Sequence, residues 1–270
     1  MFWLMPMIFS KKSFKQTNFK YFPFLLVVFG NLWIWRMFSE NFIIGISAVF
    51  ASWFLYRSIR KERLEKLLIV FLLILVVFQI KSTNIMSLSY LNEQEGVIKL
   101  QRLNEYPPVK ITLISKTIWV PIAHWLEERP ETLAMYRIQS NLGEIVNPNL
   151  YFFANHPNER VGIDEHEGFP YLLLPLFVIG LFSFNFRKNF TAISASLFAP
   201  IFLTAGAGLQ IGVEPISLFP FISLCSVLGI ENVWEKVAKL KSQNLKILII
   251  FLFISLYLLT FLQVYLYDRY

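Results

Sequence analysis

Long apolar runs separated by short polar connectors set the pattern of this chain. A helix of about 20 residues crosses the hydrocarbon core of a bilayer, and a shorter run can span it with tilt or local thinning. Seven runs approach this length and predict transmembrane helices: 21–38, 42–56, 67–80, 171–186, 190–209, 216–230 and 245–266. The first two are so closely connected that they predict a tight hairpin, which either spans fully with tilt or enters the membrane only in part.

A polar stretch, 81–170, separates the third run from the fourth. Apolar residues at helical spacing predict an amphipathic helix over 87–105, and Pro130 begins a further predicted helix over 131–145. Between them, 110–127 is apolar but interrupted by a proline, and it carries tryptophans suited to a lipid–water interface. We therefore expect two or three helices along the membrane surface rather than an independent globular domain.

Lysine and arginine are distributed unevenly among the connectors. On the side of the N-terminus the connectors hold fifteen cations, whereas the two short connectors on the other side hold none. The polar stretch, with eleven acids and eight cations, falls on that other side. This is the positive-inside pattern of membrane proteins. It predicts a plasma (inner) membrane protein with a cytoplasmic N-terminus, and with 81–170 and the C-terminus outside the cytoplasm.

The predicted fold is therefore all-α and polytopic, with about seven transmembrane helices and an extracytoplasmic helical insert between helices three and four. Its segments in chain order are a cytoplasmic or interfacial lead (1–20), three transmembrane helices (21–80), the insert (81–170), four transmembrane helices (171–267) and an extracytoplasmic tail (268–270). The composition agrees with this organisation, because 56% hydrophobic and 16% charged residues are typical of multi-pass membrane proteins.

Charge and cysteine content narrow the function classes. The net charge of +7 comes from the connectors between apolar runs, so we expect the lipid bilayer and not nucleic acid as a partner. The single cysteine, Cys225, excludes a disulfide framework within the chain and a cysteine-based metal site. No charged residue lies at the centre of a predicted span, which weighs against an ion pump and leaves a small-solute transporter as the weakest alternative.

The densest group of polar side chains lies at the end of the insert, within 147–170. It carries two imidazoles, a guanidinium and four carboxylates: His156, His166, Arg160, Glu159, Asp164, Glu165 and Glu167. The last three of these carboxylates lie beside His166, so one of them could act as a general acid or base. Imidazole and carboxylate could also ligate zinc or manganese, but in a predicted loop their spacing is uninformative, and we assign neither a metal site nor a cofactor. The remaining alternative is a solvated, hydrogen-bonded loop without catalytic or binding chemistry, which positions the insert on the membrane surface.

Lipid contact and a lone carboxylate give two further candidates. His156 and Arg160 could bind a lipid phosphate at the outer interface, and the aromatic residues before them could sit among acyl chains: Tyr151, Phe152 and Phe153. Glu40 is the one titratable group between the first two predicted spans. It could act as a catalytic base, or it could be a wetted helix-end charge partnered by Arg36 one turn earlier.

The phrase NPNLYFFANHPNERVG, followed by a Gly-containing acidic link and by FPYLLLPLFVIGLF, resembles the second half of bacterial GT-C membrane glycosyltransferases. The later phrase PISLFPFISLCSVLGIENVW is similar to a span of that family, so the resemblance covers 130–230. The resemblance implies an enzyme that takes a sugar from a polyprenyl phosphate carrier at the outer face of the membrane. It also implies that His156 and Arg160 match the region that meets the lipid phosphate.

The chain departs from that family in its first outer loop. GT-C enzymes carry an acidic pair or triad there, whereas this loop is Ser39-Glu40-Asn41, and the predicted spans are fewer than in the family. We expect a GT-C-like protein that binds or acts on lipid-linked sugars, with Glu40 or a loop acid as base if it is catalytic. The alternative is a non-enzymatic assembly subunit whose insert docks a membrane protein partner.

Overall fold

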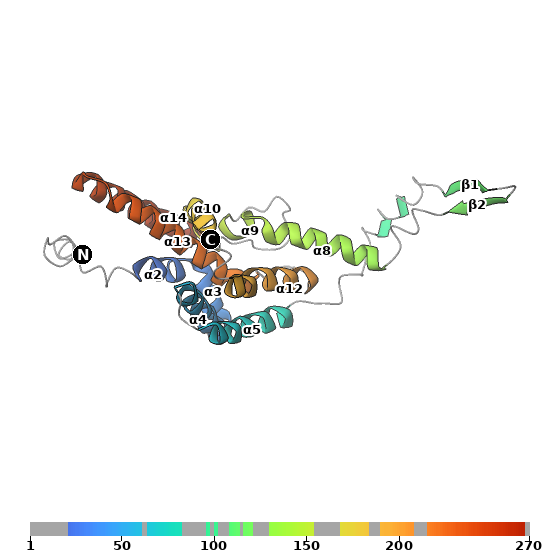
Figure 1. Cartoon of the computed structure of the whole chain (residues 1–270), viewed down its shortest axis with the longest axis horizontal. Coiled ribbons are helices and arrows are strands. Elements are labelled where there is room, and N and C mark those ends of the chain that lie inside the picture. Colours follow the sequence, from blue (N-terminus) through green and yellow to red (C-terminus); the bar gives the residue numbers. More distant parts are fainter. Residues whose placement is uncertain are drawn as a thin grey trace.

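The computed structural model describes residues 21–60, 64–82, 96–97, 100–101, 108–113, 116–120, 130–153, 168–183, 190–207 and 215–267. Most of these residues lie in helices that pack into one bundle, and the described part of the chain also contains a two-stranded sheet (Figure 1). The predicted all-α class is therefore confirmed for the bundle, with the small sheet as an addition.

The predicted first span is broken into two helices. α2 (Phe22–Phe29) and α3 (Leu32–Glu40) meet at Gly30, and their axes are bent by 59°. Asn41 then turns the chain into the next helix, because its side chain accepts a hydrogen bond from the backbone N–H of Ile43 and caps that helix. The close connection of the first two predicted spans is thus confirmed, and the structure adds a bend within the first of them.

The second predicted span is longer than expected. α4 (Phe42–Ile59) continues past the apolar run because no helix-breaking residue follows it, and its 18 residues extend about 27 Å. α5 (Glu65–Ser82) packs beside α4 through Phe71, whose ring stacks on Phe50 at 5.2 Å and on Phe54 at 5.6 Å between centroids. These stacked rings fix the pairing of the two helices.

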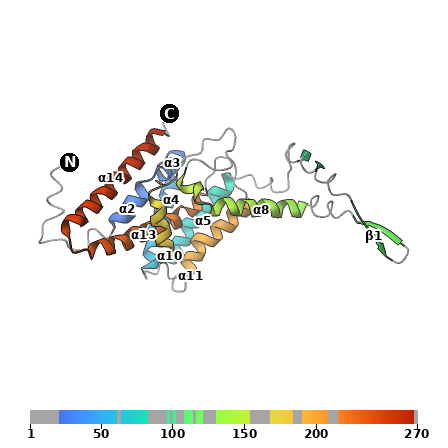
Figure 2. The same cartoon turned by 90° about the horizontal axis from the view of Figure 1, so that it is seen from above.

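α13 (Phe219–Ala238) lies at the centre of the bundle. Its first half is buried, and it packs against α10 (Leu173–Ser183), α4 and α2. α14 (Gln243–Tyr267) follows it and lies at the edge of the bundle (Figure 2). Most of its apolar side chains are exposed. The other elements of this half of the chain are α11 (Phe190–Ile193), the π-helical turn η3 (Ser194–Phe198), α12 (Ala199–Ala207) and the 3-10 turn η4 (Ile216–Leu218).

Among the described residues, three helices are long and apolar enough to cross a membrane, or four if the bent pair α2–α3 counts as one span. They are α4, the continuous η4–α13 helix and α14, which correspond to predicted spans two, six and seven. α10 and the α11–α12 segment are apolar but shorter. The helical structure and its apolar helices therefore fit a membrane protein, whereas the count of seven spans, the kind of membrane and the orientation stay predictions.

Two glycines bring α10 and α13 into backbone contact. A Cβ added at Gly180 of α10 would overlap the carbonyl oxygen of Cys225, and one added at Gly229 of α13 would overlap that of Leu176. Positions 176 and 180 lie one turn apart on one helix, as do 225 and 229 on the other. Such contacts through small residues are the usual means by which membrane helices approach closely.

The prediction of a helical insert is wrong for its middle part. β1 (Val109–Leu113) and β2 (Lys116–Val120) form an antiparallel hairpin there. The physical reason is that apolar and polar residues alternate along β1 and that β-branched residues fill both strands, which favours the pleated backbone. α8 (Pro130–Val146) confirms the predicted helix that Pro130 begins, whereas most of 87–105 lies outside the described residues.

Candidate functional site

The break between α2 and α3 is closed by the side chain of Asn31. Its Nδ2 donates hydrogen bonds to the carbonyl oxygens of Val27 (2.7 Å) and Val28 (2.9 Å). Its Oδ1 accepts one from the backbone N–H of Ile34 (2.9 Å). One buried amide therefore satisfies the end of the first helix and caps the start of the second, which suits asparagine because it offers donors and an acceptor together.

A tyrosine from the last helix completes the break. The hydroxyl of Tyr257 in α14 lies 2.6 Å from the carbonyl oxygen of Gly30, to which it donates, and 3.3 Å from that of Leu26. Non-helical backbone inside a bilayer needs such partners, since no water is present to supply them. A Cβ at position 30 would lie 2.6 Å from this hydroxyl, so glycine leaves the room that Tyr257 needs.

Directly after the break, Trp33 packs into an aromatic cluster. Its ring centroid lies 5.9 Å from that of Tyr151, 5.7 Å from that of Phe169 and 5.4 Å from that of Phe219. All four side chains are buried. The cluster therefore joins α3, the end of the insert and the central helix α13 through edge-to-face and tilted ring contacts.

The same cluster holds together the two ends of the polar loop, 154–167. The backbone N–H of Phe169 donates to the carbonyl oxygen of Tyr151 at 2.7 Å, and that of Trp33 donates to Gly168 at 3.4 Å. A Cβ at Gly168 would lie 3.1 Å from the Tyr151 oxygen and 3.2 Å from the Trp33 ring, so only glycine fits there without displacement. The loop thus leaves and rejoins the described structure at one place, beside the start of α3.

The aromatic residues before the loop do not face lipid as predicted. Tyr151 and Phe152 are buried among the helices, and only Phe153 is partly open, at 38% exposure. Tyr151 and Phe152 belong to α9 (Asn149–Phe152), a single helical turn in which both side chains are buried. The hydroxyl of Tyr151 then donates to the carbonyl oxygen of Ile145 at 2.8 Å. The predicted acyl-chain contact is therefore wrong for Tyr151 and Phe152.

Glu40 is the one predicted site residue that the structure describes. It ends α3, and its side chain is exposed. The loop ends meet α3 at Trp33, about 10 Å along the helix axis from Glu40. The other predicted site residues lie outside the described residues: His156, Arg160, Asp164, Glu165 and Glu167.

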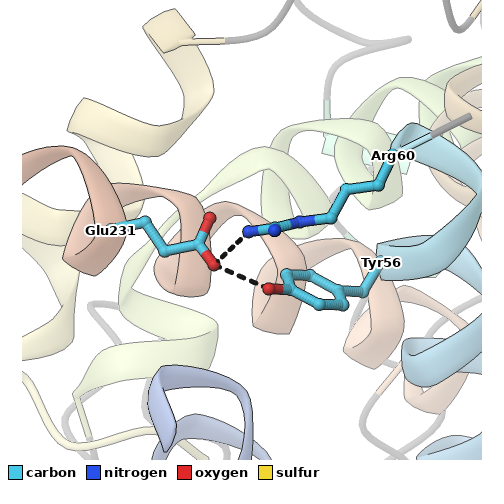
Figure 3. A network of polar contacts seen from close by, with 3 residues as sticks. All are labelled: Tyr56, Arg60 and Glu231. Carbon is cyan, nitrogen blue, oxygen red and sulfur yellow. Dashed lines mark hydrogen bonds and ion pairs between the residues drawn. The ribbon is translucent and has the colours of Figure 1, made fainter. Parts of the chain in front are cut away.

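Glu231 organises a polar cluster that the sequence analysis did not single out. Its Oε1 accepts hydrogen bonds from the Tyr56 hydroxyl (2.7 Å) and from the Arg60 guanidinium (2.5 Å), as Figure 3 shows. The guanidinium also lies over the Tyr56 ring, 4.6 Å from its centroid. The cluster ties the end of α4 to α13. The sequence offered one indication of this contact: Arg60 and Glu231 lie in connectors that are predicted to be on the same side of the membrane.

A further polar cluster lies where α5, α12 and η4 meet. Gln79 donates through Nε2 to the Thr204 hydroxyl (2.6 Å), and its Oε1 accepts from the backbone N–H of Ser217 (3.2 Å). The hollow beside these side chains has no room for a water molecule. The cluster is therefore a packed contact between helices. In the described ranges, no three His, Cys, Asp or Glu side chains are grouped as metal ligands.

No family model matches this chain, and comparisons with curated proteins and with solved structures also find no match. The GT-C resemblance therefore rests on the quoted phrases alone.

Proposed function

We propose that this protein is GT-C-like and binds a polyprenyl-phosphate-linked sugar at the outer face of a plasma (inner) membrane. The observation that carries the proposal is the anchoring of both ends of the 154–167 loop beside Trp33. The segment that carries His156 and Arg160 therefore starts and ends at one place in the described structure, beside the first turn of α3.

The loop side chains supply the chemistry for this ligand. We assign Arg160 and His156 to the lipid phosphate, because a guanidinium donates paired hydrogen bonds to phosphate oxygens and an imidazolium adds positive charge. In a transfer reaction the base that takes the proton of the acceptor hydroxyl is one of four carboxylates: Glu40, Asp164, Glu165 or Glu167. The helix α3 carries Glu40 and also holds the loop ends, so one element supports both groups.

The variant H156A/R160A tests this assignment. We expect it to lower affinity for undecaprenyl phosphate at least tenfold, since each charge-assisted hydrogen bond contributes about 1.5–3 kcal/mol. Native mass spectrometry of the full-length protein in micelles, titrated with this lipid, measures the bound fraction. The control K239A/K241A removes two exposed cations near the end of α13 and should bind undecaprenyl phosphate with the affinity of the unchanged protein. Unchanged binding by the loop variant would sink the assignment.

The exposed face of α14 favours a second candidate, a non-enzymatic assembly subunit. This helix buries Tyr257 and Thr260, and its other large side chains are largely exposed and apolar, which suits lipid or a membrane protein partner. Native mass spectrometry after gentle extraction from the protein's own membranes separates the candidates. A co-purifying polyprenyl phosphate that is lost in R160A supports the first. A stoichiometric protein partner without such a lipid supports the second.

A further inference from the structure

The β1–β2 hairpin has two chemically different faces. In an antiparallel pair, directly opposed residues share a face. One face carries the pairs Val109–Val120 and Ile111–Ile118 and, at its turn end, Leu113–Lys116, so it is apolar apart from Lys116. The opposite face carries Lys110–Trp119 and Thr112–Thr117. The apolar face is open, with Val109 47% and Ile118 52% exposed.

A hairpin of this kind requires a covering surface. Two strands alone are at best marginally stable in water and need packing on their apolar face. The hairpin lies beyond the N-terminal end of α8 and apart from the helical bundle (Figures 1 and 2), so the bundle does not supply that surface. In Figure 2, α8 runs along the long axis of the molecule, at a clear angle to α14.

Charge indicates which surface covers it. The segment 106–126 contains Lys110 and Lys116 but no acid, whereas the rest of the insert carries all eleven of its acids. Each lysine near an anionic bilayer contributes about 1 kcal/mol of attraction. Lys116 lies on the apolar face, whereas Lys110 lies on the opposite face with its ammonium 5.9 Å from the ring centroid of Trp119.

We propose that the β1–β2 hairpin lies on the surface of an anionic bilayer and anchors the insert there. Val109, Ile111 and Ile118 face the acyl chains, and the ammonium group of Lys116 on the same face reaches the headgroup phosphates, as in other amphipathic elements at the membrane surface. Lys110 on the opposite face adds its positive charge to the attraction. This role is independent of whether the 154–167 loop binds a lipid-linked sugar.

Nitroxide accessibility in the full-length protein tests the proposal. In a Cys225→Ala background, Ile118→Cys carries the label on the apolar face and Thr117→Cys carries it on the polar face. The protein is placed in nanodiscs of phosphatidylcholine and phosphatidylglycerol. Collision with oxygen, which concentrates in lipid, is compared with collision with a water-soluble nickel chelate. We expect the label at 118 to favour oxygen and the label at 117 to favour nickel. Ile111→Cys should repeat the result for 118.

Two results would overturn the proposal. A label at 118 that meets nickel as readily as the label at 117 would show open solvent. A label at 118 shielded from both reagents would show a protein partner or a second copy of this chain. The charge contribution is tested by K110E/K116E, which should lose the oxygen preference at 118, whereas K239E/K241E should keep it. Because the readout is the position of the hairpin, failure here is distinguishable from failure of lipid-linked sugar binding.

Discussion

At the residue scale, Gly229 and Gly180 allow two helices to pack closely because they lack a side-chain methyl group. Each faces a main-chain carbonyl oxygen of the neighbouring helix, so α10 and α13 meet at backbone distance. Gly206 in α12 is the opposite case, since nothing lies within 4 Å of the position of its Cβ. The same residue type is therefore required at two positions of the bundle and dispensable at a third.

Gly229→Ala is expected to lower the free energy of unfolding by about 1–3 kcal/mol, because an added methyl group forces the two helices apart. Gly206→Ala is the matched control and should be neutral or stabilising by up to about 1 kcal/mol, since alanine favours the helix over glycine. Denaturant titration in mixed micelles measures both variants. Equal shifts in the two variants would contradict the close-contact account.

At the scale of elements, α3 positions the candidate site. It begins at Asn31, which closes the break, and Trp33 in its first turn holds the ends of the polar loop. Tyr257 supports this start from α14, through the carbonyl oxygen of Gly30. α14 is therefore attached to the site by a specific hydrogen bond, although it packs loosely on the rest of the bundle.

Tyr257→Phe tests this attachment. Removal of the hydroxyl leaves the partly buried Gly30 carbonyl without that donor and is expected to destabilise the protein by about 1 kcal/mol. Tyr136→Phe makes the same chemical change at an exposed position of α8 and should have no effect. Thermal unfolding of the two purified variants is compared with that of the unchanged protein. The absence of a difference would show that the hydroxyl does not support the break.

At the scale of the whole molecule, polar clusters join helix ends that lie far apart in sequence. Tyr56 and Arg60 reach Glu231 across 175 and 171 positions, and Gln79 reaches Thr204 across 125. The first cluster uses ends predicted to be cytoplasmic, and the second uses ends predicted to lie outside. The arrangement agrees with the predicted grouping of connectors, whereas the side of the membrane on which each lies stays a prediction.

Double-mutant cycles compare the two bonds to Glu231. The Tyr56–Glu231 pair is expected to couple by about 1.5–3 kcal/mol, because a buried hydroxyl donates to a carboxylate. The Arg60–Glu231 pair is partly exposed and should couple by less than about 1 kcal/mol. Tyr56→Phe, Arg60→Ala and Glu231→Ala, with the two double variants, supply the unfolding free energies. A stronger Arg60 coupling would reverse the ranking.

The local sequence alone determined the helices α4, α13 and α14 and the helix α8 behind Pro130. Lipid burial requires long apolar helices whatever their neighbours, and proline marks a helix start without tertiary help. The alternation in the hairpin was also present in the sequence, but short apolar stretches do not distinguish helix from strand until the backbone is paired.

Only the tertiary structure decided how these elements meet. The sequence marks Asn31 as an odd residue in an apolar run, but it does not show that Tyr257 completes the break beside it. It marks the polar loop as the candidate site, but it does not show that Trp33 holds the loop ends. The physical reason is that such contacts join residues distant in the chain. Their partners depend on shape complementarity across the packed core, which no local pattern of polar and apolar residues specifies.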